Sequence, residues 1–121
     1  MCERGCGSII NFSSIAGQHG GVVGSPAYGA AKAAIIGMTR SLARRFGPRG
    51  VRVNCIAPAD INTDMTASWS QDLRQKLIDL TPLNRFGESQ EVGAAAVFLA
   101  SDESSFITGQ TVSINGGAYM A

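Results

Sequence analysis

The chain has 121 residues, of which 45% are hydrophobic and 16% charged, a composition typical of one globular domain and unlike that of disordered or fibrous proteins. Its formal net charge of +1, without any basic block, gives no reason to expect nucleic acid or a membrane as a partner. No apolar run approaches the ~20 residues of a membrane span. No signal-peptide core follows the first residues, so we expect a cytoplasmic protein.

The three cysteines, Cys2, Cys6 and Cys55, match neither a disulfide framework nor a zinc site in their spacing. His19 is the only histidine that could join them. We therefore predict free thiols and no bound metal, with Cys55 acting as a small hydrophobic residue of a strand.

The first predicted element is a strand over residues 8–12, an isoleucine-rich run suited to a parallel sheet covered on both faces. Ser14 follows at its carboxyl end, the edge at which open α/β sheets bind ligands. The glycine-rich residues 17–24 predict a loop and fit no phosphate-binding motif. We expect His19, within that loop, to be solvated; contact with substrate at the mouth of a cleft is the less favoured alternative.

A long helix is predicted next. Ser25 and Pro26 are a capping residue and a first helical residue, and Gly47 and Pro48 mark its end. Alanines dominate its first half and few of its faces are polar. We therefore expect burial against the sheet and against another subunit.

Tyr28 and Lys32 lie four residues apart at the start of this helix, so their side chains share one face. A neighbouring ammonium favours the phenolate form of a tyrosine, which makes Tyr28 a candidate general acid/base. Ser14 is the candidate for holding a carbonyl or alkoxide oxygen against the phenol. The spacing alone favours an ordinary pair with the lysine over the ring; the surrounding motifs reverse that preference.

The β-branched residues 51–57 predict the next parallel strand, which completes a βαβ unit. Asp60 and Asp64, which follow it, are expected to be solvated turn carboxylates and not a catalytic pair. Leucines at helical spacing predict one amphipathic helix over residues 69–80. Plain packing is the favoured role of each leucine, although the helix is also suitably placed to be a lid over a cleft.

Residues 82–87 predict a loop, and Ser89 is predicted to cap a helix over about residues 90–100. Its buried side is expected to comprise Val92, Ala95, Ala96 and Leu99. Residues 110–114 predict a last strand. The predicted fold is α/β, a parallel sheet of about three strands with flanking helices.

Four segments in the order 7–17, 28–34, 51–58 and 106–117 carry a family likeness. Together they resemble the C-terminal half of a classical short-chain dehydrogenase/reductase, with a general likeness to the 3-oxoacyl-(acyl carrier protein) reductases. By this resemblance, residues 1–121 form the C-terminal catalytic part of a single Rossmann-type domain, and the three strands are the C-terminal portion of its doubly wound parallel sheet.

The resemblance implies hydride transfer between NAD or NADP and a small-molecule carbonyl or alcohol substrate. It makes Tyr28 the proton donor, Ser14 the group that orients the oxygen, and Lys32 a ligand of the nicotinamide ribose that also favours the phenolate. Tyr28 and Lys32 thus count as cofactor-binding residues too. Homodimers or homotetramers are also implied.

Further contacts are expected after the second strand. By the same resemblance, Pro58, Ile61 and Thr63 touch the carboxamide end of the nicotinamide, with Ala59 in place of the usual glycine. Met65 and Trp69 are the residues that we expect to touch substrate.

The glycine-rich dinucleotide motif of the family and the residue that selects NAD or NADP are absent from this sequence. A competing hypothesis is therefore a non-catalytic fragment or assembly piece, inactive without the half that binds the rest of the cofactor.

Overall fold

The computed structural model describes residues 1–120. At its centre is a three-stranded parallel sheet of β1 (Gly7–Phe12), β2 (Val51–Pro58) and β5 (Thr111–Ile114), in the order β1-β2-β5. The predicted α/β fold, with three parallel strands and flanking helices, is confirmed. All three strands lie within one residue of their predicted bounds.

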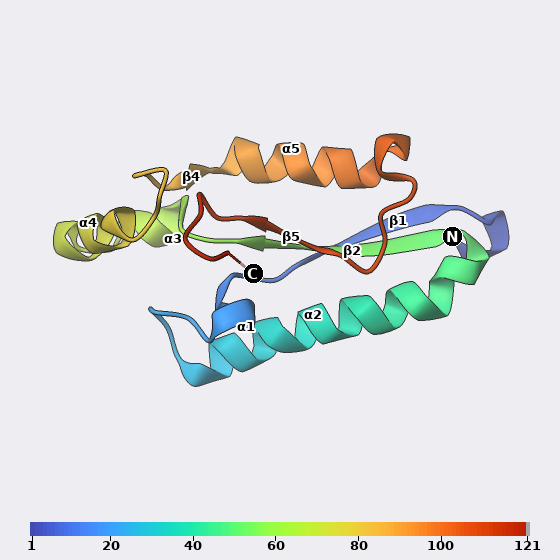
Figure 1. The fold of residues 1–121 in the computed structure, drawn as a ribbon, viewed down its shortest axis with the longest axis horizontal. Coiled ribbons are helices and arrows are strands. Elements are labelled where there is room, and N and C mark those ends of the chain that lie inside the picture. Colours follow the sequence, from blue (N-terminus) through green and yellow to red (C-terminus); the bar gives the residue numbers. More distant parts are fainter. Residues whose placement is uncertain (121) are drawn as a thin grey trace.

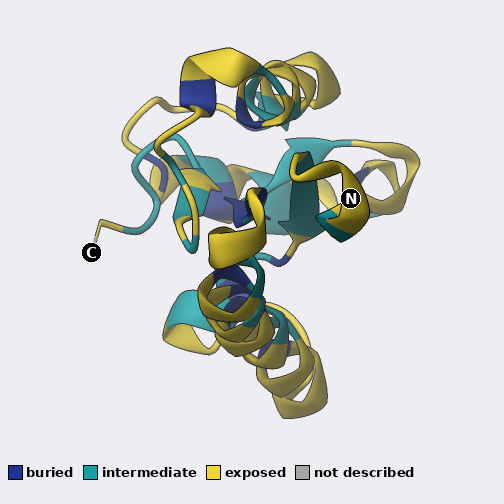
Figure 2. Ribbon diagram, turned by 90° about the vertical axis from the view of Figure 1, so that its right-hand side faces the viewer, coloured by how far each residue is buried: buried dark blue, intermediate teal, exposed yellow. Residues whose placement is uncertain are grey.

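Helices cover both faces of this sheet. Helix α2 (Pro26–Phe46) packs on one face and α5 (Ser89–Ala100) on the other (Figure 1). The central strand β2 is therefore sandwiched, and its Val53 and Cys55 side chains are fully buried. Figure 2 shows the buried residues concentrated along the sheet between the helices. A continuous apolar run is what such a doubly covered strand requires.

The remaining elements are short. Several of them gather where β1 and β2 end, on the left of Figure 1. They are η1 (Cys2–Arg4), α1 (Ala16–His19), η2 (Gly47–Arg49), β3 (Ile61–Asn62), α3 (Asp64–Ala67), α4 (Gln71–Asp79), β4 (Gly87–Glu88) and η3 (Asp102–Ser104).

Helix α2 begins and ends as predicted. The Ser25 hydroxyl accepts a hydrogen bond from the Tyr28 N–H at 3.3 Å, and Pro26 is the first helical residue. Its buried residues are Gly29, Ile36, Thr39 and Ala43. The other side is open in this chain, where Met38 is 48% exposed. Burial of α2 against the sheet is confirmed, and burial of its other side against another subunit stays a prediction.

The loop predicted over residues 17–24 is wrong at its start, because Ala16–His19 forms helix α1. A Cβ on Gly17 would lie 2.6 Å from the Lys32 backbone carbon, so this glycine lets α1 pack directly on α2. Such a short helix owes its stability to packing and not to its own propensity, which is why the glycine-rich pattern concealed it.

The single helix predicted over residues 69–80 is confirmed as α4, which is shorter by two residues at its start and by one at its end. The Ser70 hydroxyl accepts a hydrogen bond from the Leu73 N–H at 3.3 Å and caps α4, so the helix starts only at Gln71. Trp69 consequently lies in the connection between α3 and α4.

Ser89 does not cap α5 as predicted, because it is the first helical residue and Glu88 precedes it as the cap. The Glu91 carboxylate accepts a hydrogen bond from the Glu88 N–H at 2.8 Å, the reciprocal half of a capping box. The predicted inner side of α5 is confirmed, with Leu99 fully buried.

A second, two-stranded sheet escaped the sequence reasoning. Residues of β3 pair with β4 in parallel, Ile61 opposite Gly87 and Asn62 opposite Glu88. The Asn62 side chain also donates a hydrogen bond to the Glu88 carboxylate at 2.6 Å. This small sheet fixes the segment that follows β2.

No helix within residues 1–120 is long and apolar enough to cross a membrane. The three cysteines are unpaired, and burial raises the pKa of the Cys55 thiol.

Candidate active site

A cleft of about 690 Å³ opens at the carboxyl ends of β1 and β2. Its wall is built from the segment after β1, the start of α2 and the stretch from β3 to α4. Six of the predicted site residues line it together: Ser14, Tyr28, Ile61, Thr63, Met65 and Trp69. Lys32 and Pro58 lie outside this lining. The cleft is where open α/β sheets bind their ligands.

Ser14 is held in place by the backbone on either side of it. The Ser13 N–H donates to the Ile56 carbonyl at 2.8 Å, and the Ile15 N–H donates to the Pro58 carbonyl at 3.0 Å, which extends the β1 pairing past the strand. The Ser14 Oγ accepts a hydrogen bond from the Ala16 N–H at 3.1 Å. Its own hydroxyl proton remains available to donate to a ligand oxygen.

Tyr28 and Lys32 share a face of α2, as their spacing predicts. The Lys32 Nζ lies 5.6 Å from the centroid of the Tyr28 ring and donates a hydrogen bond to the Phe12 carbonyl at 3.3 Å. This is the lysine-over-ring arrangement that the spacing alone favours. Tyr28 is 46% exposed and lines the cleft, so its phenol can be reached by a ligand.

Close backbone contacts fix α2 against the end of β1. The Ser13 Oγ donates a hydrogen bond to the Lys32 carbonyl at 2.7 Å. Gly29 is buried where a Cβ would lie 3.1 Å from the Gly20 carbonyl oxygen. These contacts hold the Tyr28 helix at a set position relative to Ser14.

The turn after β2 is also well ordered. Thr66 holds the two ends of this turn together: its Oγ1 donates a hydrogen bond to the Ile61 carbonyl at 2.7 Å and accepts one from the Thr63 N–H at 3.1 Å. Ala59 replaces the glycine of the resembled pattern without strain. Asn84 is the only non-glycine residue with positive φ in the described part of the chain.

Several cleft residues were missed or misjudged at the sequence level. The expectation that Asp60 is solvated is wrong, because it is half-buried in the cleft wall and burial raises the pKa of its carboxyl group. His19 is exposed, as predicted, and also lines the cleft, with its ring centroid 5.3 Å from that of Tyr119; its contact with substrate stays a prediction. Additional apolar lining comes from Leu77 and Leu80, which belong to the predicted helix of residues 69–80, and from Val22, Val23 and Ala118, which no motif marks.

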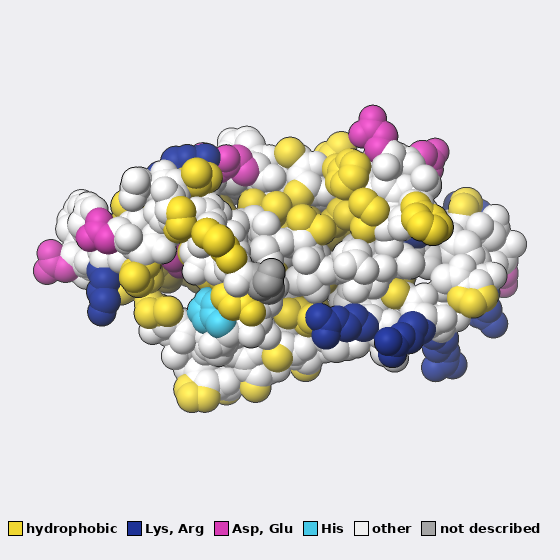
Figure 3. All heavy atoms as spheres, viewed as in Figure 1, with side chains coloured by type: hydrophobic (Ala, Val, Ile, Leu, Met, Phe, Trp, Pro, Cys, Tyr) yellow, Lys and Arg dark blue, Asp and Glu magenta, His cyan; other side chains and the backbone are white. Residues whose placement is uncertain are grey.

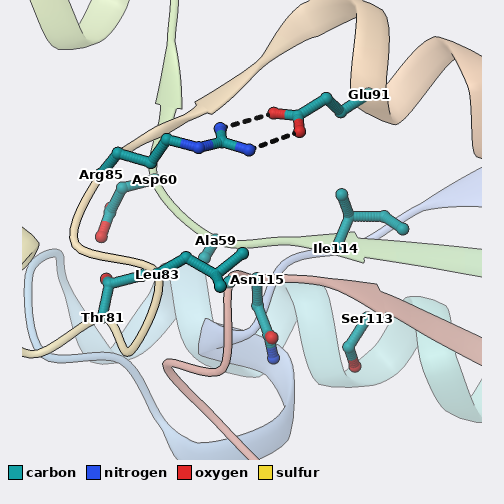
Figure 4. A pocket seen from close by; sticks show the side chains of 11 residues that line it. Ala59, Asp60, Thr81, Leu83, Arg85, Glu91, Ser113, Ile114 and Asn115 are labelled. Atoms are coloured by element: carbon teal, nitrogen blue, oxygen red, sulfur yellow. Dashed lines mark hydrogen bonds and ion pairs between the residues drawn. The ribbon is translucent and has the colours of Figure 1, made fainter.

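A second cavity of about 270 Å³ lies between the end of β5 and the segment that leads into α5 (Figure 4). There Arg85 makes a two-point contact with Glu91, with distances of 2.8 and 2.7 Å. The hydrogen bonds from Arg85 and from the Glu88 N–H lower the pKa of Glu91 to about 2.

The surface cations lie elsewhere. On the face shown in Figure 3, Lys and Arg side chains gather over the C-terminal half of α2, where Arg40, Arg44 and Arg45 are exposed. Cations at a helix C-terminus complement the helix dipole. Within residues 1–120, no three His, Cys, Asp or Glu side chains gather as metal ligands would.

A family model described as enoyl-(acyl carrier protein) reductase matches residues 1–119. The chain belongs to the short-chain dehydrogenase/reductase family. It is 47% identical over 120 residues to a 3-oxoacyl-(acyl carrier protein) reductase of Salmonella typhimurium, covering 99% of this chain and 49% of that protein. A Chlamydia trachomatis reductase of the same name is 48% identical over 117 residues, covering 97% and 47% respectively.

Solved structures of this family share the fold. A 3-oxoacyl-(acyl carrier protein) reductase from Brucella melitensis is similar to the whole chain with a TM-score of 0.97 at 45% identity, over 45% of that protein. A second Brucella melitensis structure of such a reductase, described as having bound NAD, gives 0.87 at 43% identity, over 44% of its length. The chain thus has the Rossmann-type fold of the short-chain dehydrogenases/reductases and spans about half the length of these relatives.

Proposed function

We propose that this chain is the catalytic part of an NAD(P)-dependent oxidoreductase that interconverts a carbonyl compound and an alcohol. The observation that carries the proposal is one cleft, in a short-chain dehydrogenase/reductase chain, lined by both the Ser14 hydroxyl and the Tyr28 phenol. A serine from a strand end and a tyrosine from a helix start thereby face one ligand space.

When bound here, a nicotinamide cofactor would supply the hydride to the carbonyl carbon in reduction and would accept it from the alcohol carbon in oxidation. Tyr28 gives its phenolic proton to the carbonyl oxygen during reduction and takes it back during oxidation. Ser14 donates its free hydroxyl proton to the same oxygen and stabilises the charge that develops there. The Lys32 ammonium, whose Nζ lies 5.6 Å from the centroid of the Tyr28 ring, attracts negative charge that develops beside it during proton transfer.

The residues around the cleft fit the nicotinamide end of such a cofactor. Ile61 and Thr63 line the cleft beside Tyr28, in a turn held by Thr66 and by the β3–β4 pairing. We propose that these residues, with Pro58 at the end of β2, hold the carboxamide end and that Lys32 binds the ribose. The relative described as having bound NAD supports a nicotinamide cofactor, with NAD and NADP as the two candidates.

The relatives' name makes a 3-oxoacyl thioester the first substrate to assay. A homodimer or homotetramer is the proposed assembly, supported by the exposed apolar side of α2 and by Val97 and Phe98 on α5, which are 71% and 40% exposed. Large apolar side chains that are exposed to solvent are typical of interaction surfaces.

The alternative, a non-catalytic piece of a longer enzyme, is favoured by the chain's match to only about half of each relative. An assay of the purified chain separates the two proposals. NADH and NADPH are each offered with a 3-oxoacyl thioester, and the alcohol product is measured. Alcohol formed in proportion to oxidised cofactor supports catalysis; none, from a folded chain, supports the alternative.

A further inference from the structure

Asp60 occupies the wall common to the cleft and the second cavity, both of which it lines. Its backbone is firmly placed. The Asp60 carbonyl accepts a hydrogen bond from the Gly87 N–H at 3.0 Å, and the next residue, Ile61, pairs with Gly87 in the small sheet. The carboxylate therefore projects from an ordered strand start.

This carboxylate makes no hydrogen bond or ion pair within residues 1–120. The guanidinium of Arg85, which lines the second cavity with it, is held by Glu91 at two points. Figure 4 shows the Asp60 carboxyl group pointing away from that pair. The neighbouring Thr81 hydroxyl is also engaged, donating to the Leu77 carbonyl at 2.9 Å. The oxygens of Asp60 thus remain free to accept.

The cleft that Asp60 lines has many apolar side chains in its wall, among them Trp69, Leu77 and Leu80. A purely apolar ligand at this place would remove water from the carboxylate without replacing its hydrogen bonds, and this desolvation costs free energy. A ligand with an O–H or N–H donor would replace the lost water, and hydrogen bonds to a charged acceptor are the strong ones.

We infer that Asp60 determines substrate specificity: the substrate carries a hydroxyl or ammonium group that donates a hydrogen bond to this carboxylate. The inference rests on the proposed function, because it takes a carbonyl compound as the occupant of the cleft. It narrows that class to polar carbonyl compounds and disfavours those with a plain hydrocarbon chain at this point.

Matched ketones provide the test. In 4-hydroxy-2-butanone and 2-pentanone, a hydroxyl group replaces a methyl group at equal size. Each is titrated into the ¹⁵N-labelled chain by NMR, following the indole N–H of Trp69, the only tryptophan and a cleft residue. We expect the hydroxy ketone to bind about tenfold more tightly than 2-pentanone, the effect of one hydrogen bond to a charged group.

Two variants of Asp60 locate the effect. The ratio compared is the dissociation constant of 2-pentanone divided by that of the hydroxy ketone. In Asp60→Leu this ratio falls to about one or below, and in Asp60→Asn it takes an intermediate value. The matched control is Asp64→Asn, which removes an exposed carboxylate that lines neither cavity and leaves the ratio unchanged. A parallel comparison of butylammonium with 1-butanol tells an ammonium preference from a hydroxyl preference.

Equal binding of the two ketones, or a ratio that both Asp60 variants retain, overturns the inference. The inference is also overturned if none of the probes produces a saturable chemical-shift change. Because this experiment measures binding and not turnover, a failure of the inference can be distinguished from a failure of the proposed function. A wild-type chain that shows the expected ratio but transfers no hydride contradicts the function and leaves the specificity of Asp60 intact.

Discussion

The two cavities of this molecule differ in what their polar side chains are doing. In the smaller one, Arg85 and Glu91 satisfy each other and the Glu88 N–H, so the polar groups hold the entry to α5 together. In the larger cleft, the Ser14 hydroxyl keeps a free proton and the Tyr28 phenol is exposed. The Asp60 carboxylate, in the wall common to both cavities, has no partner among the described residues.

That difference distinguishes polar groups that stabilise the fold from polar groups that are available to a ligand. Paired groups stabilise the fold, and their removal should change stability. Unpaired groups that face a cleft are free to act on a ligand, and their removal should change binding or catalysis with little effect on folding. Each of the following substitutions tests one side of this comparison.

The largest effect is expected for Tyr28→Phe, which removes the proton donor but keeps the ring. We expect nearly all oxidoreductase turnover to disappear while the melting temperature stays within a few degrees. The control is Tyr119→Phe, at the only other tyrosine, which should retain activity. Retained turnover in the Tyr28 variant would refute its role in proton transfer.

Ser14→Ala should have the next largest effect. Loss of one donor to the developing oxyanion typically costs about 10²–10³-fold in kcat. The backbone bonds on either side of Ser14 remain, so the circular dichroism spectrum should not change. An unchanged kcat would show that the Ser14 hydroxyl has only a structural role, its hydrogen bond with the Ala16 N–H in the turn before α1.

The exposed Arg85–Glu91 pair should make a small contribution to stability that depends on pH in the acid range. The pKa of Glu91 is lowered to about 2 from an ordinary value of 4.5, so its contribution to stability is present above about pH 4.5 and is lost as the pH falls towards 2. In Glu91→Gln this part of the pH dependence should disappear. Melting curves between pH 2 and 5 would measure it, with turnover at neutral pH unaffected.

The smallest effect is expected for the stability of Asp60→Asn. Burial raises the pKa of Asp60, so the folded state holds its proton more tightly than the unfolded state. Stability contributed by the protonated form is therefore lost as the pH rises through 3.8 towards the folded value. The variant should be slightly more stable than wild type at pH 7 and equal to it at pH 3, which denaturant titration can check. A less stable variant at pH 7 would show that this carboxylate has a structural partner.

The three strands and helix α2 were predictable because local signals agree with the fold there: Ser25 and Pro26 start the helix, and an apolar run marks β2. Family motifs led to Ser14 and Tyr28. What could not be predicted depends on contacts distant in sequence. Helix α1 is held by the close packing of Gly17 on the Lys32 backbone. The β3–β4 sheet pairs two segments that carry no local strand pattern, and the burial of Asp60 depends on that pairing.

The central claim, that this chain holds the nicotinamide end of the cofactor beside Tyr28, is tested most directly by comparing reduced nicotinamide mononucleotide with NADH. Fluorescence titrations should give saturable binding of both, with similar dissociation constants, and weaker binding of both in Lys32→Met. No saturable binding of the mononucleotide, or NADH binding more than about tenfold tighter, would contradict the account.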